Sequence, residues 1–148
     1  MGLKLNLGSG NIKMLDFISV DINPDIADVV WDLRKTPYPF EDRSCEYICA
    51  HHLVEHLYAH EHMTFMSECW RILDNNGYLE LIFPTWDSEY AWIDPTHVRG
   101  IHPKQYEYFT KVHGFEYTDK FWNIHASGPE ENNPLFWIVL LSPDKDLK

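Results

Sequence analysis

The chain has 148 residues, enough for one hydrophobic core, and we expect residues 1–148 to form a single domain. It carries 23 acidic and 12 basic residues, and its lysines and arginines do not cluster, which disfavours nucleic acid as a partner. No apolar run reaches the ~20 residues of a membrane span, and the chain opens almost directly on a predicted strand rather than a signal peptide, so we expect a cytoplasmic protein with no membrane partner.

Short apolar runs alternate with turn residues and helical patterns, which predicts an α/β fold. The expected elements in chain order are strands at 3–7, 17–21, 27–31 and 47–50, a helix with apolar residues at 63, 66, 70 and 73, a strand at 78–83, an irregular aromatic segment at 85–100, a short helix at 103–109, and strands at 115–124 and 135–141. Asn75-Asn76-Gly77 is expected to end the long helix as a left-handed cap, and residues 128–134 to form the last hairpin loop.

The lengths of the connections predict a Rossmann-like, seven-stranded, mostly parallel sheet in the order 3-2-1-4-5-7-6, with the last two strands antiparallel. Only seven residues, 11–17, separate the first glycine turn from the core of the second strand. A parallel crossover normally takes a dozen or more residues. The first crossover helix is therefore expected to be reduced to a turn or two. The sheet face that it leaves thin would suit a covering loop or a second copy of the chain in a homo-oligomer.

The first predicted strand runs into a glycine turn, Leu5-Asn6-Leu7-Gly8-Ser9-Gly10, and the second strand closes on Asp21. Glycine has no Cβ and tolerates positive φ, so such a turn lets the backbone approach a ligand closely. A carboxylate at the end of the next strand offers two acceptor oxygens to the hydroxyls of a ribose. The pattern predicts a nucleoside site, and the alternative is a plain turn followed by a solvated strand end.

A dinucleotide is the first candidate for this nucleoside, but Lys13 stands at the third glycine position of the usual fingerprint and Asp21 comes too early. The nearly absent helix would also leave a diphosphate without its main electrostatic support. S-adenosylmethionine fits better because it has no phosphate. It needs a close backbone turn, an acid for its ribose and a polar contact for its adenine.

At these residues the chain resembles the class I S-adenosylmethionine-dependent methyltransferases, most closely their small, type 11-like branch. The similar segments follow one another in order, and they are Leu5-Asn6-Leu7-Gly8-Ser9-Gly10, Val20-Asp21-Ile22, Trp31-Asp32-Leu33, residues 45–56, residues 68–73 and residues 77–81. The resemblance implies S-adenosyl-L-methionine as cofactor, bound by Asn6, Gly8, Ser9, Gly10, Asp21, Ile22, Asp32, Leu33 and His51. It implies that Asp32 contacts the adenine amine and that His51 lies beside the transferred methyl. A capping residue and a surface histidine are the alternatives.

The segment Asp94-Pro95-Thr96-His97-Val98-Arg99 follows the fifth strand, and similar segments of the family lie at the acceptor side of the pocket. An oxygen acceptor usually needs a general base that titrates near neutrality, so His97 is the first catalytic candidate and His51 the second. Asp94 and Arg99 are expected to bind the acceptor, Arg99 through an anionic group. The same role is expected for the flanking aromatic residues, Trp86, Tyr90 and Trp92. The alternative is a polar loop held by its own hydrogen bonds, with the aromatic residues as core cover.

His52-x-x-Glu55-His56 matches the His-x-x-Glu-His pattern of zinc proteases, which requires a long helix and a third ligand. In the expected fold this stretch is the turn after the fourth strand. We therefore predict no functional metal site. The neighbouring His60 and His62 add imidazoles that can take up adventitious zinc or nickel.

Three functions follow from these observations. The first is methyl transfer from S-adenosylmethionine to a small-molecule or glycan-like acceptor. The second is a non-catalytic domain that binds S-adenosylmethionine or acts as a scaffold, which the short length and thin first crossover favour. The third is a zinc hydrolase built on His52, Glu55 and His56. The sequence does not name the acceptor.

Overall fold

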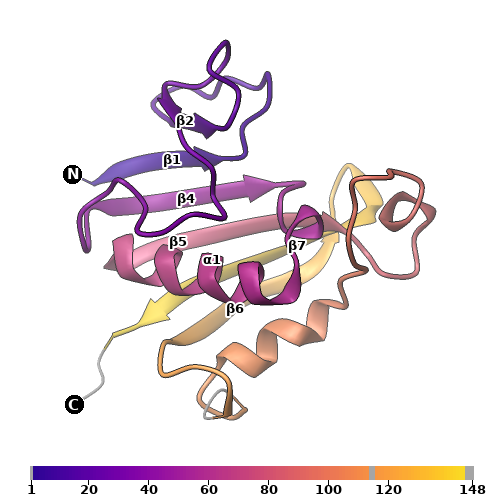
Figure 1. Ribbon diagram of the computed structural model, residues 1–148. Coiled ribbons are helices and arrows are strands. Elements are labelled where there is room, and N and C mark those ends of the chain that lie inside the picture. The colour runs from indigo at the N-terminus through magenta and orange to yellow at the C-terminus, as the bar shows by residue number, and fades with distance from the viewer. Residues whose placement is uncertain (1, 114–115, 146–148) are drawn as a thin grey trace.

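One sheet organises the molecule, and the computed structural model describes it through residues 2–113 and 116–145 (Figure 1). Its seven strands lie in the order β3-β2-β1-β4-β5-β7-β6. They are β1 (Leu3–Leu7), β2 (Ile18–Asp21), β3 (Val29–Val30), β4 (Cys45–His51), β5 (Leu73–Pro84), β6 (Phe121–Glu130) and β7 (Asn133–Asp144). Neighbours among β1 to β5 are parallel, and β7 runs antiparallel to both β5 and β6. The predicted fold class and strand order are confirmed.

The main helix, α1 (Ala59–Ile72), packs on one face of the sheet (Figure 1). Three short 3₁₀ helices accompany it in the described part of the chain, and they are η1 (Val54–His56), η2 (Glu89–Ala91) and η3 (Pro103–Phe109). The apolar side of α1 meets the buried side chains of β5 in one core, which includes Phe65, Met66, Cys69, Ile72, Leu79, Leu81 and Phe83. Because side chains alternate along a strand, Tyr78 and Glu80 of β5 point to the other face, where they remain partly exposed. Among the described residues no α-helix covers that face.

The first crossover is shorter than expected, because no helix lies between β1 and β2 in the described chain. Residues 8–17 form turns instead. Asn6 Nδ2 donates to the carbonyl of Ile12 at 3.3 Å and holds this loop against the end of β1. The loop therefore keeps the glycine turn beside β2 without a helix to bridge the two strands.

The connection from α1 to β5 differs from the prediction of a left-handed cap. The helix ends at Ile72, and Leu73 is already extended, with φ −70° and ψ 142°. Gly77 lies within β5, where an added Cβ would come within 2.9 Å of Leu73 Cδ2. The pairing with β4 shifts its register between Cys45 and Tyr47, so residues 74–77 form an irregularity of the strand. Close packing, not helix termination, accounts for this glycine.

The β6–β7 hairpin also turns later than predicted. Glu130 pairs with Asn133, so the turn contains only Glu131 and Asn132. Gly128 and Pro129 belong to β6, which is the edge strand of the sheet, and an edge tolerates both residue types. The predicted strand at 115–124 begins instead at residue 121, and Phe115 lies outside the described residues.

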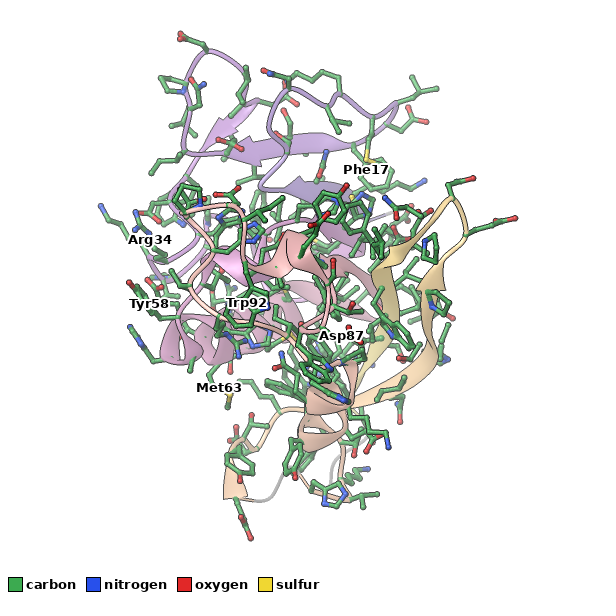
Figure 2. The ribbon with its side chains drawn as sticks, turned by 90° about the vertical axis from the view of Figure 1, so that its right-hand side faces the viewer. Phe17, Arg34, Tyr58, Met63, Asp87 and Trp92 are labelled. Atoms are coloured by element: carbon green, nitrogen blue, oxygen red, sulfur yellow. The ribbon has the colours of Figure 1, made fainter. Side chains whose placement is uncertain are left out.

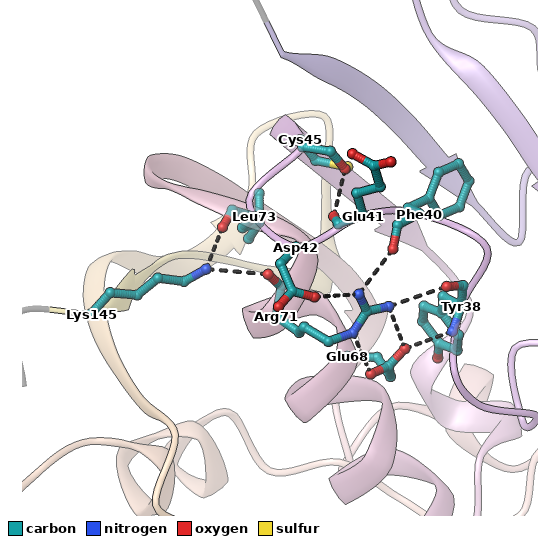
Figure 3. A network of polar contacts seen from close by, with 10 residues as sticks. Tyr38, Phe40, Glu41, Asp42, Cys45, Glu68, Arg71, Leu73 and Lys145 are labelled. Carbon is teal, nitrogen blue, oxygen red and sulfur yellow. Dashed lines mark hydrogen bonds and ion pairs between the residues drawn. The ribbon is translucent and has the colours of Figure 1, made fainter.

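Arg71, near the end of α1, fixes the segment that leads from β3 to β4 (Figure 3). Its guanidinium donates to the carbonyls of Tyr38 at 3.1 Å and Phe40 at 2.9 Å and pairs with Glu68 at 2.9 Å. Glu68 in turn accepts from the Tyr38 amide at 2.6 Å, and the Tyr38 hydroxyl donates to the Leu33 carbonyl at 2.7 Å. The network therefore anchors the chain that follows β3.

Two further properties bear on the setting of the protein. Cys45, Cys49 and Cys69 are free and buried. None of the described helices has the length and apolar character to cross a membrane.

Candidate active site

A cleft of about 240 Å³ lies at the carboxyl ends of β1, β2 and β3. Ligands of open α/β sheets bind at this edge. Residues from four separate segments line the cleft, and they are Gly8, Asp21, Ile22, Trp31, Asp32, Leu33, Arg34, Leu53, His56 and Leu57. Five of the residues predicted to bind the cofactor therefore come together in one wall, although they are distant in sequence. They are Gly8, Asp21, Ile22, Asp32 and Leu33.

The glycine turn uses a conformation that suits glycine at two positions, because Gly8 has φ 67° and Gly10 has φ 53°. The amide of Gly8 donates to the Val20 carbonyl at 2.8 Å, which ties the end of β1 to β2. A Cβ on Gly8 would lie 2.9 Å from Leu53 Cδ1, whereas one on Gly10 would meet no atom within 4 Å. The turn therefore keeps Gly8 in close contact with the segment after β4.

Asp21 joins the turn to the end of β2 through both carboxylate oxygens. Oδ2 accepts from the Gly10 amide at 2.9 Å, and Oδ1 accepts from the Asn23 amide at 3.0 Å. Each oxygen of a carboxylate has a second lone pair. The carboxylate is thus oriented by the backbone and can still accept from two hydroxyls of a ligand.

Asp32 lies in the same cleft and forms a bidentate pair with Arg34, at 2.9 Å to Nε and 3.0 Å to Nη2. This hydrogen bond is the main reason that the pKa of Asp32 is lowered. The carboxylate therefore stays charged near neutrality. An adenine amine would have to share the Asp32 carboxylate with Arg34, and the predictions from the sequence do not include this ion pair.

The other residues predicted to bind the cofactor lie outside the lining of this cleft. Asn6, Ser9 and Gly10 support the turn from within the loop. His51 ends β4, with Nε2 2.6 Å from Glu80 Oε1, and this hydrogen bond is the main cause of the lowered pKa of Glu80. Glu80 belongs to the face that α1 does not cover. The structure thus engages the His51 ring with a carboxylate.

A second cavity, of about 370 Å³, adjoins the first. It is lined by His52, Glu55, His56, Pro84, Tyr90, Ile93, Asp94, His97 and Phe136. His56 contributes to the lining of both cavities, so they meet at this side chain. Tyr90, Asp94 and His97, all predicted at the acceptor side, lie together here. Phe136 reaches the cavity from β7, and no local pattern in the sequence points to it.

Three predicted acceptor residues lie elsewhere. Arg99 donates to the Leu57 carbonyl at 3.2 Å and to His62 Nδ1 at 2.8 Å, and lines a separate cavity beside α1. Trp86 stacks on His102, and the Trp92 indole, 64% exposed, donates to the Trp86 carbonyl. Figure 2 views the carboxyl edge of the sheet, with the segment that carries Asp87 and Trp92 in front of the strands.

The strand order and the cleft at the switch between β1 and β4 define a class I methyltransferase fold. A family model described as a methyltransferase domain matches residues 11–81, and over this part the chain is similar to the class I S-adenosylmethionine-dependent methyltransferases. A search of curated proteins gave no significant match.

Solved structures share the fold at low sequence identity. An S-adenosylmethionine-dependent methyltransferase from Archaeoglobus fulgidus has a TM-score of 0.69 at 18% identity, over 94% of this chain and 85% of that one. The trans-methyltransferase CalH, solved with S-adenosylhomocysteine, has a TM-score of 0.66 at 17% identity, over 97% and 52%. A TehB-like methyltransferase from Corynebacterium glutamicum has a TM-score of 0.64 at 14% identity, over 97% and 81%.

Proposed function

We propose that the protein methylates an oxygen atom of a small-molecule or glycan-like acceptor held in the second cavity. The observation that carries this proposal is the meeting of the two cavities at His56. Methyl transfer requires the acceptor atom, the methyl carbon and the sulfur in line, so a donor cleft that opens onto an acceptor cavity is the required arrangement.

The first cavity suits S-adenosylmethionine in shape and in charge. Gly8 lets the backbone approach the ligand, and Asp21 presents two oriented acceptor oxygens. Among the residues that line the cleft, Arg34 is already paired with Asp32, which leaves no free guanidinium for a phosphate. With Asp32 paired to Arg34, the Asp21 carboxylate leaves the lining with a net negative charge. This charge favours a positively charged ligand, and S-adenosylmethionine carries a sulfonium.

The second cavity suits an acceptor that loses a proton during transfer. Bound S-adenosylmethionine supplies an electrophilic methyl whose bond to sulfur breaks with both electrons left on sulfur. The acceptor oxygen supplies the electron pair of the new bond, and its proton must leave. We assign that proton to the polar groups of the cavity, with His97 the first candidate and Asp94 beside it, 3.6 Å away. Phe136 and Tyr90 supply apolar walls.

Several earlier expectations belong to this proposal. A small-molecule acceptor agrees with the excess of acidic residues, which disfavours a nucleic acid. The cytoplasm agrees with three free buried cysteines, because thiols persist in a reducing compartment. A homo-oligomer formed through the uncovered sheet face stays a prediction.

The proposal is tested by calorimetric titration with S-adenosylmethionine and S-adenosylhomocysteine, followed by mass spectrometry of products from a panel of hydroxylated acceptors. Asp21→Ala removes two hydrogen bonds to the ribose, and at about 1–1.5 kcal/mol each the affinity should fall roughly 30- to 150-fold. Asp25→Ala, which removes an exposed carboxylate nearby, is the control and should bind as the wild type does.

Unchanged cofactor affinity in a folded Asp21→Ala protein would contradict the ribose assignment. Cofactor binding without any methylated product would favour the non-catalytic binding domain instead.

A further inference from the structure

Three potential metal ligands meet at the second cavity. Glu55, His56 and His97 each offer one ligand atom, and these atoms lie within 4.8 Å of one another. Glu55 and His56 belong to η1, and His97 comes from the loop after η2. The Val98 amide donates to the Glu55 carbonyl at 3.0 Å, which fixes the loop against η1. The cluster is therefore held by backbone contacts and not by chance proximity of long side chains.

The Glu55 carboxylate is buried without a hydrogen-bond donor. Its side chain is 1% exposed, and among the described residues no donor lies within hydrogen-bond distance of either oxygen. His52 Nδ1 lies 3.6 Å and His97 Nε2 4.0 Å from Oε1, both beyond hydrogen-bond distance. A buried carboxylate is unfavourable unless it is paired or coordinates a cation. Within the described part of the chain, the buried Glu55 carboxylate therefore lacks a hydrogen-bond donor that would compensate its charge.

Both imidazoles are oriented to offer a lone pair. His97 Nδ1 lies 3.2 Å from the Ala91 carbonyl, and His56 Nδ1 lies 3.3 Å from the Thr96 carbonyl. The Thr96 hydroxyl, 3.1 Å from His56 Nδ1, donates its own hydrogen to Asp94 at 2.7 Å and so accepts from the ring. A carbonyl oxygen only accepts, so in each ring Nδ1 carries the hydrogen and Nε2 keeps its lone pair. Histidine ligands of metals are commonly fixed in this way, with the second ring nitrogen donating to a carbonyl.

We propose that Glu55, His56 and His97 bind a first-row divalent transition-metal ion such as Zn²⁺ or Mn²⁺. Two imidazole nitrogens and one carboxylate suit these ions, whereas Mg²⁺ and Ca²⁺ prefer sites made of oxygen. Three protein ligands leave coordination positions open, and the three residues all line the second cavity.

The catalytic effect of the ion rests on the proposed function, the methylation of an acceptor oxygen. A divalent ion in the second cavity would bind the acceptor hydroxyl oxygen and lower its pKa, so that the proton leaves to solvent before the oxygen forms its bond to the methyl carbon. Nε2 of His97 has one lone pair, which can bind either a metal ion or a proton. With a metal ion bound, His97 would therefore not act as the general base.

The ligand set differs from the sequence motif that surrounds it. His52-x-x-Glu55-His56 lies on a turn and a short 3₁₀ helix, not on the long helix of a zinc protease. His52 has φ 57°, and its ring packs against Phe136 with centroids 4.6 Å apart. The third ligand is His97, which lies far along the chain. The prediction of no functional metal site was based on the position of the motif in a turn and did not consider His97 as a third ligand; no finding tests it.

Metal binding is tested on untagged protein treated with EDTA and then dialysed. Calorimetric titration with ZnCl₂ and MnCl₂ should give one ion per chain, and CoCl₂ should give visible absorption bands of a bound ion. Glu55→Gln, which keeps the shape of the side chain, and His97→Ala should each weaken binding at least 100-fold. His60→Ala, an exposed histidine of α1, is the matched control and should bind as the wild type does.

The inference fails if the folded wild type takes up no stoichiometric ion, or if Glu55→Gln and His97→Ala bind as tightly as the control. Melting curves of all variants confirm that each compared protein is folded.

S-adenosylhomocysteine should bind to the metal-free protein with an affinity within about twofold of its affinity for the metal-loaded protein. Methyl transfer that continues without metal would remove the catalytic role of the ion and leave the proposed function intact. Stoichiometric metal without transfer to any acceptor would support the ion site and count against the proposed function.

Discussion

Acidification should destabilise this protein through one buried histidine. His62 is 3% exposed, contacts Arg99 through Nδ1 at 2.8 Å and Tyr106 through Nε2 at 3.1 Å, and packs among the rings of Phe65 and Phe109. Burial, and secondarily the charge of Arg99, lowers the pKa of His62 from 6.5 to about 3. The ring is therefore neutral in the folded protein, with Nδ1 accepting from the guanidinium.

The sign and size of the effect follow from this lowered pKa. Below pH 6.5 the unfolded chain binds a proton at His62 that the folded chain does not, so the stability present above pH 6.5 is lost as the pH falls toward the folded pKa. One such proton changes the free energy of unfolding by about 1.4 kcal/mol per pH unit. Between pH 6.5 and 4.5 the expected loss is about 2–3 kcal/mol, a substantial part of the total stability of a typical domain.

The assay is urea unfolding at closely spaced pH values on the wild type, His62→Gln and His60→Gln. His62→Gln removes the titrating ring and should flatten the slope of stability against pH in this window. His60→Gln changes an exposed histidine of the same helix and should keep the slope. Equal slopes in the wild type and His62→Gln would refute the argument, whatever the difference in their stability at neutral pH.

Two other pairs of substitutions test the glycine turn after β1 and the hydrogen-bond network around Arg71. Gly8→Ala should cost about 1–3 kcal/mol of stability, because an alanine there has a strained positive φ and meets Leu53, and Gly10→Ala, with open space around it, should cost less in the same melting experiment. Glu68→Gln should cost about 1–3 kcal/mol in urea unfolding, because it weakens partly buried bonds to Arg71 and Tyr38, whereas Asp42→Asn, an exposed partner of the same arginine, should cost less than about 1 kcal/mol. Equal losses within either pair would contradict the corresponding reasoning.

Part of the cleft proposed to bind the cofactor could be predicted because Gly8, Asp21 and Asp32 lie at or just beyond the ends of strands. Parallel strands bring their carboxyl ends to one edge of the sheet, so Gly8, Asp21 and Asp32 had to lie near one another once the strand order was known. Arg34 was missed there, as were the lining residues Trp31, Leu53, His56 and Leu57. The position of Arg34 two residues after Asp32 gave a usable signal, since side chains so close in a turn readily pair.

The second cavity could be predicted only in part, because it contains Tyr90, Asp94 and His97 but not Trp86, Trp92 or Arg99. The course of residues 85–101 is set by distant contacts, such as the bond from the Trp86 amide to the Ile101 carbonyl at 3.0 Å. The same limit explains the errors at Gly77 and Gly128, where glycine signalled a turn. Gly128 pairs with Ile138 of β7, and the residues on either side of the irregularity that contains Gly77 pair with β4, so both glycines lie within a strand instead.

Arg99 shows how the loop that carries His97 is divided between anchoring and function. The sequence predicts that the Arg99 guanidinium holds an anionic acceptor. In the structure the guanidinium instead contacts His62 of α1, and burial lowers the pKa of Arg99. A neutral His62 is what allows this contact, since a protonated ring would repel the guanidinium and have no lone pair at Nδ1. Arg99 and the bond from Val98 to Glu55 thus fix the loop from one side. This anchoring is the reason that His97, two residues earlier, stays in the second cavity beside Glu55.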